Sequence, residues 1–384
     1  MLFNSLQFLF GFLPIVYFVF WRLRSRQTRY IWLTLTGYVF YSFWDYRFCS
    51  LMALSTIVSY AAGRGMLAHP HRKRVYLWTA VATDLALLGF FKYAGFAMRS
   101  TSELAALFGW NLAVPAWNIV LPIGISFYTF HTITYIVDAY RGVIVPTKNF
   151  FEFSAYVSLF AQLVAGPIVR FRQIEADLED LDGADKRRDL DVGWSFFTIG
   201  LIKKVLIADG LALLIDPMWA TAGTLSTPDA WLAALGYTYQ LYFDFSGYSD
   251  MAVGLGLMFG LRLPQNFNSP YKAVDIADFW RRWHISLSTI LRDYLYIPLG
   301  GSRGGSLMTY RNLLITMLLG GLWHGAAWTF VIWGGYHGVL LCLHRLTAHR
   351  TAILPLAIRQ LSTFGLVVLG WVWFRSPTVA DALV

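Results

Sequence analysis

The chain opens with MLFNSLQFLFGFLPIVYFVFW (residues 1–21) and continues with RLRSRQTR (residues 22–29). The first stretch carries no charged residue, and about 20 mainly apolar residues suffice to cross the hydrocarbon core of a bilayer. It has neither the basic start nor the small-residue cleavage site of a removable signal, so we expect it to remain as the first membrane helix. Because arginine is enriched in cytoplasmic loops, the four arginines of 22–29 predict a cytoplasmic loop and an N-terminus outside.

The composition of the whole chain is typical of a membrane protein. Hydrophobic residues make up 57% of the 384 residues and charged residues 14%, whereas soluble proteins carry roughly a quarter of charged residues. The net charge of +9 comes from short basic clusters between apolar runs, so we expect membrane lipids around the chain and no nucleic-acid partner. Cys49 and Cys342 lie in separate apolar runs without CxxC spacing, which predicts neither a disulfide nor a metal site.

Further apolar segments are long enough to cross the membrane. Together with the first, the candidate spans are 3–21, 30–45, 48–65, 76–94, 116–137, 150–168, 192–219, 230–260, 311–346 and 354–374. From Arg311 to Arg345 a single helix would be about 52 Å long, against a hydrocarbon core of about 30 Å, so this segment must bend, tilt or split. Glycines at 320–321, 325 and 334–335 are the expected break points.

Segment 150–168 conflicts with the alternation of loops across the membrane. Arg141 and Lys148 precede it, and Arg170 and Arg172 follow it, so both flanks look cytoplasmic. We therefore expect the segment to dip into the membrane and return, with the surrounding protein satisfying its backbone. The predicted fold is an all-α, multi-pass transmembrane protein with re-entrant or broken helices, and we treat 1–384 as a single membrane-embedded domain.

Segment 275–299 (DIADFWRRWHISLSTILRDYLYIPL) carries too many charges for a lipid-exposed span. As one helix it would place Trp280, Trp283 and Leu287 on one face, while Arg281, His284 and Ser288 fall on another. One interpretation is an amphipathic helix lying in the membrane interface. The other is an amphipathic helix that lines a cavity open to the cytoplasm with its polar face inward.

Histidines within apolar runs are candidates for chemistry, because an ionisable side chain is costly to place in a membrane. His324 lies in Leu-Trp-His-Gly, between glycines that allow close approach of another helix or a ligand. Its imidazole could take the proton of an attacking alcohol; the alternative is a histidine that only bonds to a neighbouring helix. On a continuous helix the His337 side chain would point about 220° away from that of His324 and lie roughly 20 Å from it. We therefore expect only a packing or supporting role for His337, and likewise for His131.

Asp244 and Asp250 interrupt the otherwise apolar run 239–251, which also contains Gln240. Six residues apart, the two carboxylates do not share a helical face, so paired acid and base chemistry is not expected. Asp244 is better suited to orienting a partner. The glycine-rich stretch 300–306 lacks the Gly-Lys-Ser/Thr ending of a phosphate-binding loop, so we expect a flexible cytoplasmic loop there.

Several of these segments together resemble the membrane-bound O-acyltransferase family, in its bacterial branch involved in alginate O-acetylation. The resemblance covers almost the whole chain and follows the order of the family's motifs. It rests on Met1-Leu-Phe-Asn-Ser5, LPIGISFYTF (121–130), QLVAGP (162–167), YFDFSGYSD (242–250), FWRRWHISLS (279–288) and GLWHG (321–325).

The resemblance implies roles for individual residues. The histidine of Leu-Trp-His-Gly is the family's essential catalytic residue, which is His324 here, and the histidine of Arg-Trp-His-Ile-Ser is its second hallmark, which is His284. Around these two we take as candidate substrate-binding residues Arg281, Trp283, Ser288, Asp244, Gln240 and Trp323.

The resemblance also implies a reaction and its partners. We expect acetyl-CoA or another acyl thioester as a donor substrate and no tightly bound cofactor. We expect transfer through a tunnel in a bacterial inner membrane to an extracytoplasmic acetyltransferase partner, and finally to a polysaccharide acceptor such as alginate.

The sequence departs from the family pattern in two places. Relatives more often have a glutamine where His131 stands, and they usually continue with apolar helices beyond the stretch 371–375, so a C-terminal truncation is an open alternative. Other acceptors also stay open: teichoic acid receiving D-alanine, cellulose or peptidoglycan. A transporter or flippase, with His324 and Asp244 relaying protons or binding substrate, is the alternative from a different class.

Overall fold

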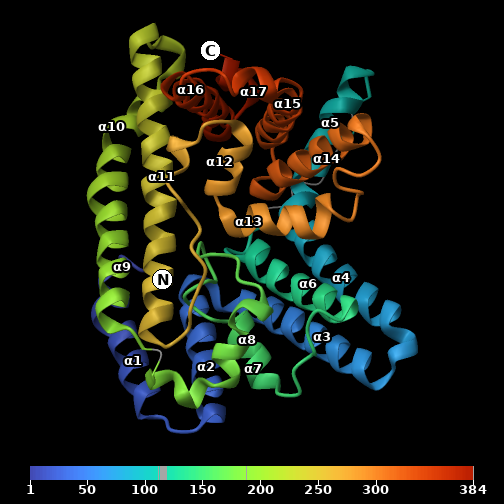
Figure 1. The fold of residues 1–384 in the computed structure, drawn as a ribbon, viewed down its shortest axis with the longest axis vertical. Helices are drawn as coiled ribbons and strands as arrows, with labels where there is room; N and C mark the ends of the chain where they lie inside the picture. The colour runs from blue at the N-terminus through green and yellow to red at the C-terminus, as the bar shows by residue number, and fades with distance from the viewer. Residues whose placement is uncertain (111, 113–118, 187, 384) are drawn as a thin grey trace. The chain divides into compact units, whose positions relative to one another are not determined.

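A computed structural model describes residues 1–110, 112, 119–186 and 188–383, and these residues form helices and loops without a β-strand (Figure 1). The all-α prediction is confirmed. The chain forms two compact units. Unit 1 comprises Met1–Phe197 and Met251–Pro264, and unit 2 comprises Thr198–Asp250 and Gln265–Val384.

Unit 1 holds the helices that the first apolar runs predict. They are η1 (Gln7–Phe12), α1 (Leu13–Arg22), α2 (Arg26–Asp45), α3 (Cys49–Ala68), α4 (Lys73–Leu88), η4 (Gly89–Tyr93), α5 (Ala94–Leu107), α6 (Ile125–Arg141), α7 (Phe150–Val157), α8 (Phe171–Glu179) and the first part of α9 (Leu190–Ile202). Ser25 sets the start of α2, because its side chain accepts a hydrogen bond from the Thr28 amide at 3.2 Å. The expected span 116–137 corresponds to α6, and its residues 116–118 lie outside the described part of the chain.

Helix α7 and the loop after it form the segment that we expect not to cross the membrane. Eight residues of helix are about 12 Å long, less than half of the hydrocarbon core. The chain then continues without a helix to Arg170, and Gln162 in this loop is fully buried. The Gln162 amide donates to the Tyr156 carbonyl at 2.5 Å, and the Tyr156 hydroxyl donates to the Val169 carbonyl at 2.9 Å. Side chains of the protein thus satisfy two carbonyl groups of this segment, and its return within the membrane stays a prediction.

Unit 2 holds the other long helices and several short ones, besides single turns. The helices are the end of α9, η6 (Lys203–Ala208), α10 (Asp209–Ala220), α11 (Thr227–Met258) as far as Asp250, α12 (Ile276–Arg282), α13 (Ile285–Ile290), η9 (Leu291–Tyr296), α14 (Ser306–His324), α15 (Trp328–Thr351), α16 (Leu356–Arg375) and α17 (Val379–Leu383). Helices α10 and α11 lie side by side (Figure 1), and a Cβ added at Gly236 would lie 2.3 Å from the end of the Ile215 side chain.

The expected long span 311–346 is split into α14 and α15. The break lies at 325–327, so the prediction of a break at Gly325 is confirmed. The predicted breaks at 320–321 and at 334–335 are wrong, because the first pair of glycines stays within α14 and the second within α15. Gly334 and Gly321 instead let the two helices touch: a Cβ on Gly321 would lie 2.2 Å from the Phe330 carbonyl oxygen, and one on Gly334 would lie 2.2 Å from that of Met317.

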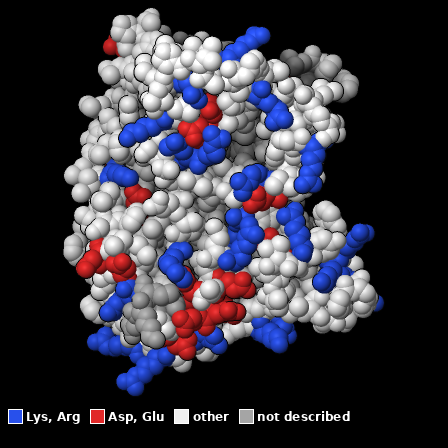
Figure 2. Space-filling view, in the orientation of Figure 1, with Lys and Arg blue, Asp and Glu red and all other residues white. Residues whose placement is uncertain are grey.

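The surface fits a lipid environment. Large apolar side chains on several helices are mostly exposed, among them Phe10, Leu213 and Leu361. On the face drawn in Figure 2, charged side chains gather in patches with uncharged surface between them. By length and composition, three helical stretches of the described residues could cross a membrane: Arg26–Ala68, Pro70–Leu107 and Leu356–Arg375. The protein is therefore a multi-pass membrane protein.

Candidate active site

The segment 275–299 is interrupted at the position of its histidine. Helix α12 ends at Arg282, α13 begins at Ile285, and His284 between them has a left-handed backbone with φ of 44°. Such a conformation is uncommon for a residue with a side chain. The expectation of one continuous helix is therefore wrong, and so is the shared polar face: the Arg281 side chain is 66% exposed, whereas His284 is buried.

Asn266 holds His284 in place. Its side-chain oxygen lies 3.3 Å from Nδ1 of His284 and also accepts hydrogen bonds from the amide and the hydroxyl of Ser286. Its own amide group donates to the Ser249 hydroxyl at 3.3 Å. This network assigns the proton of His284 to Nδ1, which leaves Nε2 as an acceptor that has no partner among the described residues. Burial lowers the pKa of His284 to about 3, so the ring is neutral near pH 7.

Asn266 is not among the site residues that the sequence predicts. It stands in Pro264-Gln-Asn-Phe-Asn268, which reads as an ordinary polar loop. The one available signal was its position between two segments already suspected of function, the 242–250 motif and the 275–299 segment.

His324 is the last residue of α14, directly before the break that reverses the chain into α15. The centres of the His324 and His284 rings are 6.3 Å apart. Three aromatic rings surround His324, those of Trp323 and Trp333 at 5.0 Å and that of Phe374 at 5.3 Å. The structure thus brings together the two histidines that the sequence singled out, although 40 positions separate them.

The two predicted tryptophans differ in their surroundings. Trp323 is buried and contacts both histidine rings, at 5.0 Å from His324 and 6.0 Å from His284. Trp283 is buried in an aromatic core, where its ring lies 4.8 Å from Trp371 and 5.0 Å from Phe267. The Ser288 hydroxyl donates to the Trp283 carbonyl at 3.2 Å, so Ser288 bridges the break between α12 and α13.

His337 does not lie far from His324, as a continuous helix would require. Because the chain reverses at 325–327, the Trp333 ring lies 5.0 Å from the His324 ring and 5.0 Å from the His337 ring. The expected separation of roughly 20 Å between the two histidines is therefore wrong. His337 is fully buried and stacks on Phe279 at 6.1 Å. It belongs to the aromatic core beside the two histidines, which agrees with a packing or supporting role.

Gln240 and Asp244 line a cavity of about 340 Å³ between η6, α10, α11 and α16. Asp244 forms an ion pair with Lys204, and Asp250 forms one with Lys203 at 2.6 Å. Between the two aspartates, Gly247 packs on the backbone of Gly200 and Lys204, so adjacent lysines can reach carboxylates six residues apart. That Asp244 orients a partner stays a prediction.

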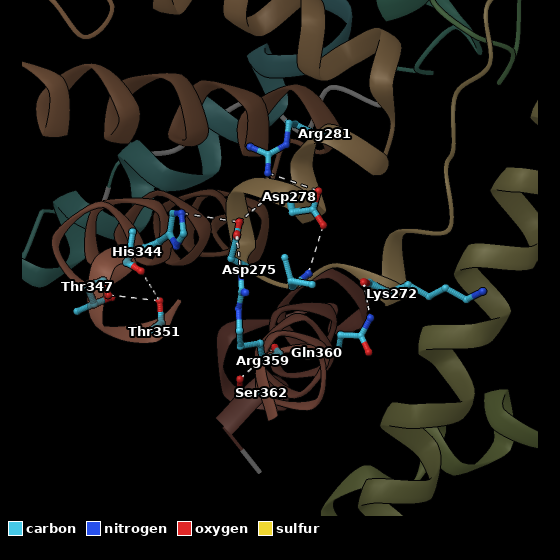
Figure 3. A network of polar contacts seen from close by, with 12 residues as sticks. Lys272, Asp275, Asp278, Arg281, His344, Thr347, Thr351, Arg359, Gln360 and Ser362 are labelled. Carbon is cyan, nitrogen blue, oxygen red and sulfur yellow. Dashed lines mark hydrogen bonds and ion pairs between the residues drawn. The ribbon is translucent and has the colours of Figure 1, made fainter. Parts of the chain in front are cut away.

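A second polar network lies at the start of α12 (Figure 3). Asp275 caps this helix by accepting from the Asp278 amide at 2.7 Å, and it faces His344 at 3.7 Å and Arg359 at 3.9 Å. Asp278 in turn accepts from Arg281 and Arg282. These contacts join α12 to α15 and α16.

Comparisons with known proteins show similarity along the whole chain. The description of the membrane-bound O-acyltransferase family matches residues 143–375. The chain is 48% identical to the probable alginate O-acetylase AlgI of Pseudomonas aeruginosa, over 100% of this chain and 73% of the relative. It is 38% identical to the peptidoglycan O-acetyltransferase of Helicobacter pylori, over 100% of this chain and 78% of the relative. A teichoic acid D-alanyltransferase of Bacillus subtilis is 28% identical over 59% of this chain and 60% of its own length.

Proposed function

Because the chain belongs to the membrane-bound O-acyltransferase family and is an O-acyltransferase, we propose that it moves acetyl from a cytoplasmic thioester across the membrane for O-acetylation of an exopolysaccharide such as alginate. The observation that carries the proposal is the 6.3 Å between the rings of His284 and His324. The names of the full-length relatives favour a polysaccharide acceptor. The whole of 1–384 acts as a single O-acyltransferase domain in this proposal.

In the chemical step, His324 acts as general base. The acceptor hydroxyl attacks the carbonyl carbon of the thioester, and its proton passes to a ring nitrogen of His324. A C–O bond forms, the C–S bond breaks, and the proton then goes to the departing thiolate. His284, whose ring lies beside that of His324, is neutral, and its Nε2 can accept a hydrogen bond. In this proposal His284 positions the donor. General-base assistance of this kind contributes roughly 10²–10⁴-fold in rate.

The donor is acetyl-CoA or another acyl thioester, and it approaches from the cytoplasm beside 275–299, where Arg281 is exposed. Trp283 and Ser288 shape this side of the site. The protein lies in a bacterial inner membrane, and an extracytoplasmic acetyltransferase partner completes transfer to the polymer. Trp323, Gln240 and Asp244 contribute to the acceptor side.

Two kinds of relative indicate alternative acceptors. The peptidoglycan O-acetyltransferase is similar over the whole chain, so peptidoglycan is the second candidate acceptor. The teichoic acid D-alanyltransferases match only about three fifths of the chain, which makes D-alanyl transfer the weaker alternative. Family membership argues against the transporter or flippase, because its relatives are named as acyl-transferring enzymes.

Mass spectrometry of surface polysaccharide tests the proposal. A deletion strain should lose O-acetyl groups, and the wild-type chain should restore them, whereas His324→Gln should not. His349→Gln is the matched control, because His349 is an exposed histidine on α15 and should restore acetylation fully. Acetylation restored by His324→Gln, or unchanged in the deletion strain, would refute the proposal.

A further inference from the structure

The turn between α3 and α4 carries positive charge that no carboxylate balances. Arg72, Lys73 and Arg74 follow one another there, and both arginines are exposed. The sequence holds no aspartate or glutamate from 46 to 83, and among the described residues none of the three cations pairs with a carboxylate. An excess of exposed cations attracts an anionic partner.

A second basic segment packs against the end of α3 that leads into this turn. The loop between α6 and α7 brings the exposed Lys148 there, because the Tyr60 hydroxyl donates to the Lys148 carbonyl at 2.7 Å. About one turn further along α3, a Cβ on Gly63 would lie 3.3 Å from the Pro146 side chain. Arg64 is the next residue of the helix. Two segments that are far apart in the sequence thus contribute cations to one end of unit 1.

Contacts across the turn hold the backbone of the basic residues in place. A Cβ on Gly65 would lie 2.3 Å from the Tyr76 ring, so the glycine lets this ring of α4 pack closely on α3. The Tyr76 hydroxyl shares a hydrogen bond of 3.2 Å with Nδ1 of His69, and the two rings stack at 6.2 Å. The Arg72 amide donates to the His69 carbonyl at 2.9 Å. A surface that is already ordered loses less conformational freedom when a ligand binds.

Exposed apolar side chains flank the cations. Val75 and Trp78 on α4 are 62% and 65% exposed, and Val145 in the loop after α6 is 71% exposed. The turn joins Arg26–Ala68 to Pro70–Leu107, two helical stretches that could each cross a membrane, so it belongs at the surface of the bilayer. Tryptophan is enriched at this depth, and Lys and Arg extend their charged ends toward the headgroups.

The preference of cytoplasmic loops for Lys and Arg does not account for this arrangement by itself. That preference acts on each loop separately, and it requires neither the packing of two basic segments against one helix end nor exposed apolar side chains beside them. Figure 2 shows Lys and Arg at the turn between α3 and α4, on the right of the view, without Asp or Glu beside them. An anionic headgroup that carries apolar chains fits both the cations and the apolar side chains.

We propose that this end of unit 1 binds the headgroup of an anionic phospholipid, whose acyl chains lie along Trp78. The site, which we call the basic surface, consists of Arg64, Arg72, Lys73, Arg74 and Lys148. Its side chains donate charge-assisted hydrogen bonds to phosphate oxygens. A zwitterionic headgroup brings an ammonium group that the same cations repel, so the basic surface prefers the anionic lipid. The inference does not rest on the proposed function, because both histidines of the candidate active site belong to unit 2.

Native mass spectrometry tests the inference by identifying the lipids that the full chain retains. The protein is released from nanodiscs that contain phosphatidylglycerol and phosphatidylcholine in equal amounts, and the wild type should retain phosphatidylglycerol preferentially. Arg72→Gln combined with Arg74→Gln should lower this preference roughly fivefold or more, since each cation near a membrane surface contributes about that factor. Arg72→Lys combined with Arg74→Lys keeps the charge and should keep the preference.

Arg47→Gln combined with Arg262→Gln is the matched control. These side chains are 67% and 66% exposed, but each pairs with a carboxylate, that of Asp45 or that of Asp177. Their loss removes the same number of cations and should leave the lipid preference at the wild-type value. An equal loss in the two Gln pairs, or a loss in the Lys pair as large as in its Gln counterpart, would overturn the inference. Equal retention of both lipids by the wild type would also overturn it and would favour an acidic protein as the partner of the basic surface.

Discussion

Helix α16 carries an arginine near each end, and the surroundings of the two arginines differ. At its start, Arg359 faces Asp275, which also caps α12 and faces His344 (Figure 3). At its end, Arg375 pairs with Asp216 but lines a cavity, and its Nε has no partner among the described residues. Phe374 beside it contacts the His324 ring.

The comparison separates polar residues that hold the fold from those that serve a ligand. At the Asp275 end, the polar side chains pair with one another or cap a helix, so their hydrogen-bonding groups are satisfied within the protein. At the Arg375 end, hydrogen-bonding capacity is left over next to two histidines. We therefore expect substitutions at the first end to change stability, and substitutions near the second to change transfer.

After His324, the largest effect on transfer should come from His284. His284→Asn should lower transfer about 100-fold, because misplacing a reacting group can cost about that much. Asparagine tolerates the left-handed backbone of this position, so the protein should still accumulate. His284→Ala should transfer as poorly and be less stable by roughly 1 kcal/mol, since alanine disfavours this backbone. Transfer by His284→Asn at the wild-type rate would remove His284 from the site.

Gly321→Ala should mainly lower stability. The new Cβ would lie 2.2 Å from the Phe330 carbonyl oxygen, and overpacking of this kind costs roughly 1–3 kcal/mol. The shift should also displace His324, which ends the same helix. Gly335→Ala is the matched control, because its Cβ would make only ordinary contact with Leu318 at 3.4 Å. Equal thermal unfolding of the two variants in detergent would contradict the close crossing of α14 and α15.

Asp275→Asn should have the smallest effect. Asparagine keeps the cap of α12 and loses only long ion pairs, so stability should fall by less than about 1 kcal/mol. Asp275→Ala also loses the cap and should cost about 1 kcal/mol more. Transfer should stay near the wild-type rate in both. A loss of transfer without a change in unfolding temperature would mean that this end also serves catalysis.

The outcome shows which features a sequence can predict. Apolar runs predicted the helices, because burial in lipid acts on each segment separately. The Leu-Trp-His-Gly and Arg-Trp-His-Ile-Ser motifs predicted the two histidines through resemblance. The break of α14 at Gly325 also followed from length and glycine.

Other features depend on contacts between distant segments. The left-handed His284 depends on Asn266, and the proximity of His337 to His324 depends on the reversal at 325–327. The pairing of Lys203 and Lys204 with aspartates six residues apart depends on the contact at Gly247. A helical wheel cannot show any of these, because each arises only after the chain has packed.

The most direct test of the histidine site is the release of free thiol from an acyl thioester by the purified protein with acceptor present. Loss of the general base should slow release roughly 10²–10⁴-fold in His324→Gln, while His349→Gln keeps the wild-type rate and both variants unfold at the wild-type temperature. Release by folded His324→Gln at the wild-type rate would contradict the assignment of His324 as the base.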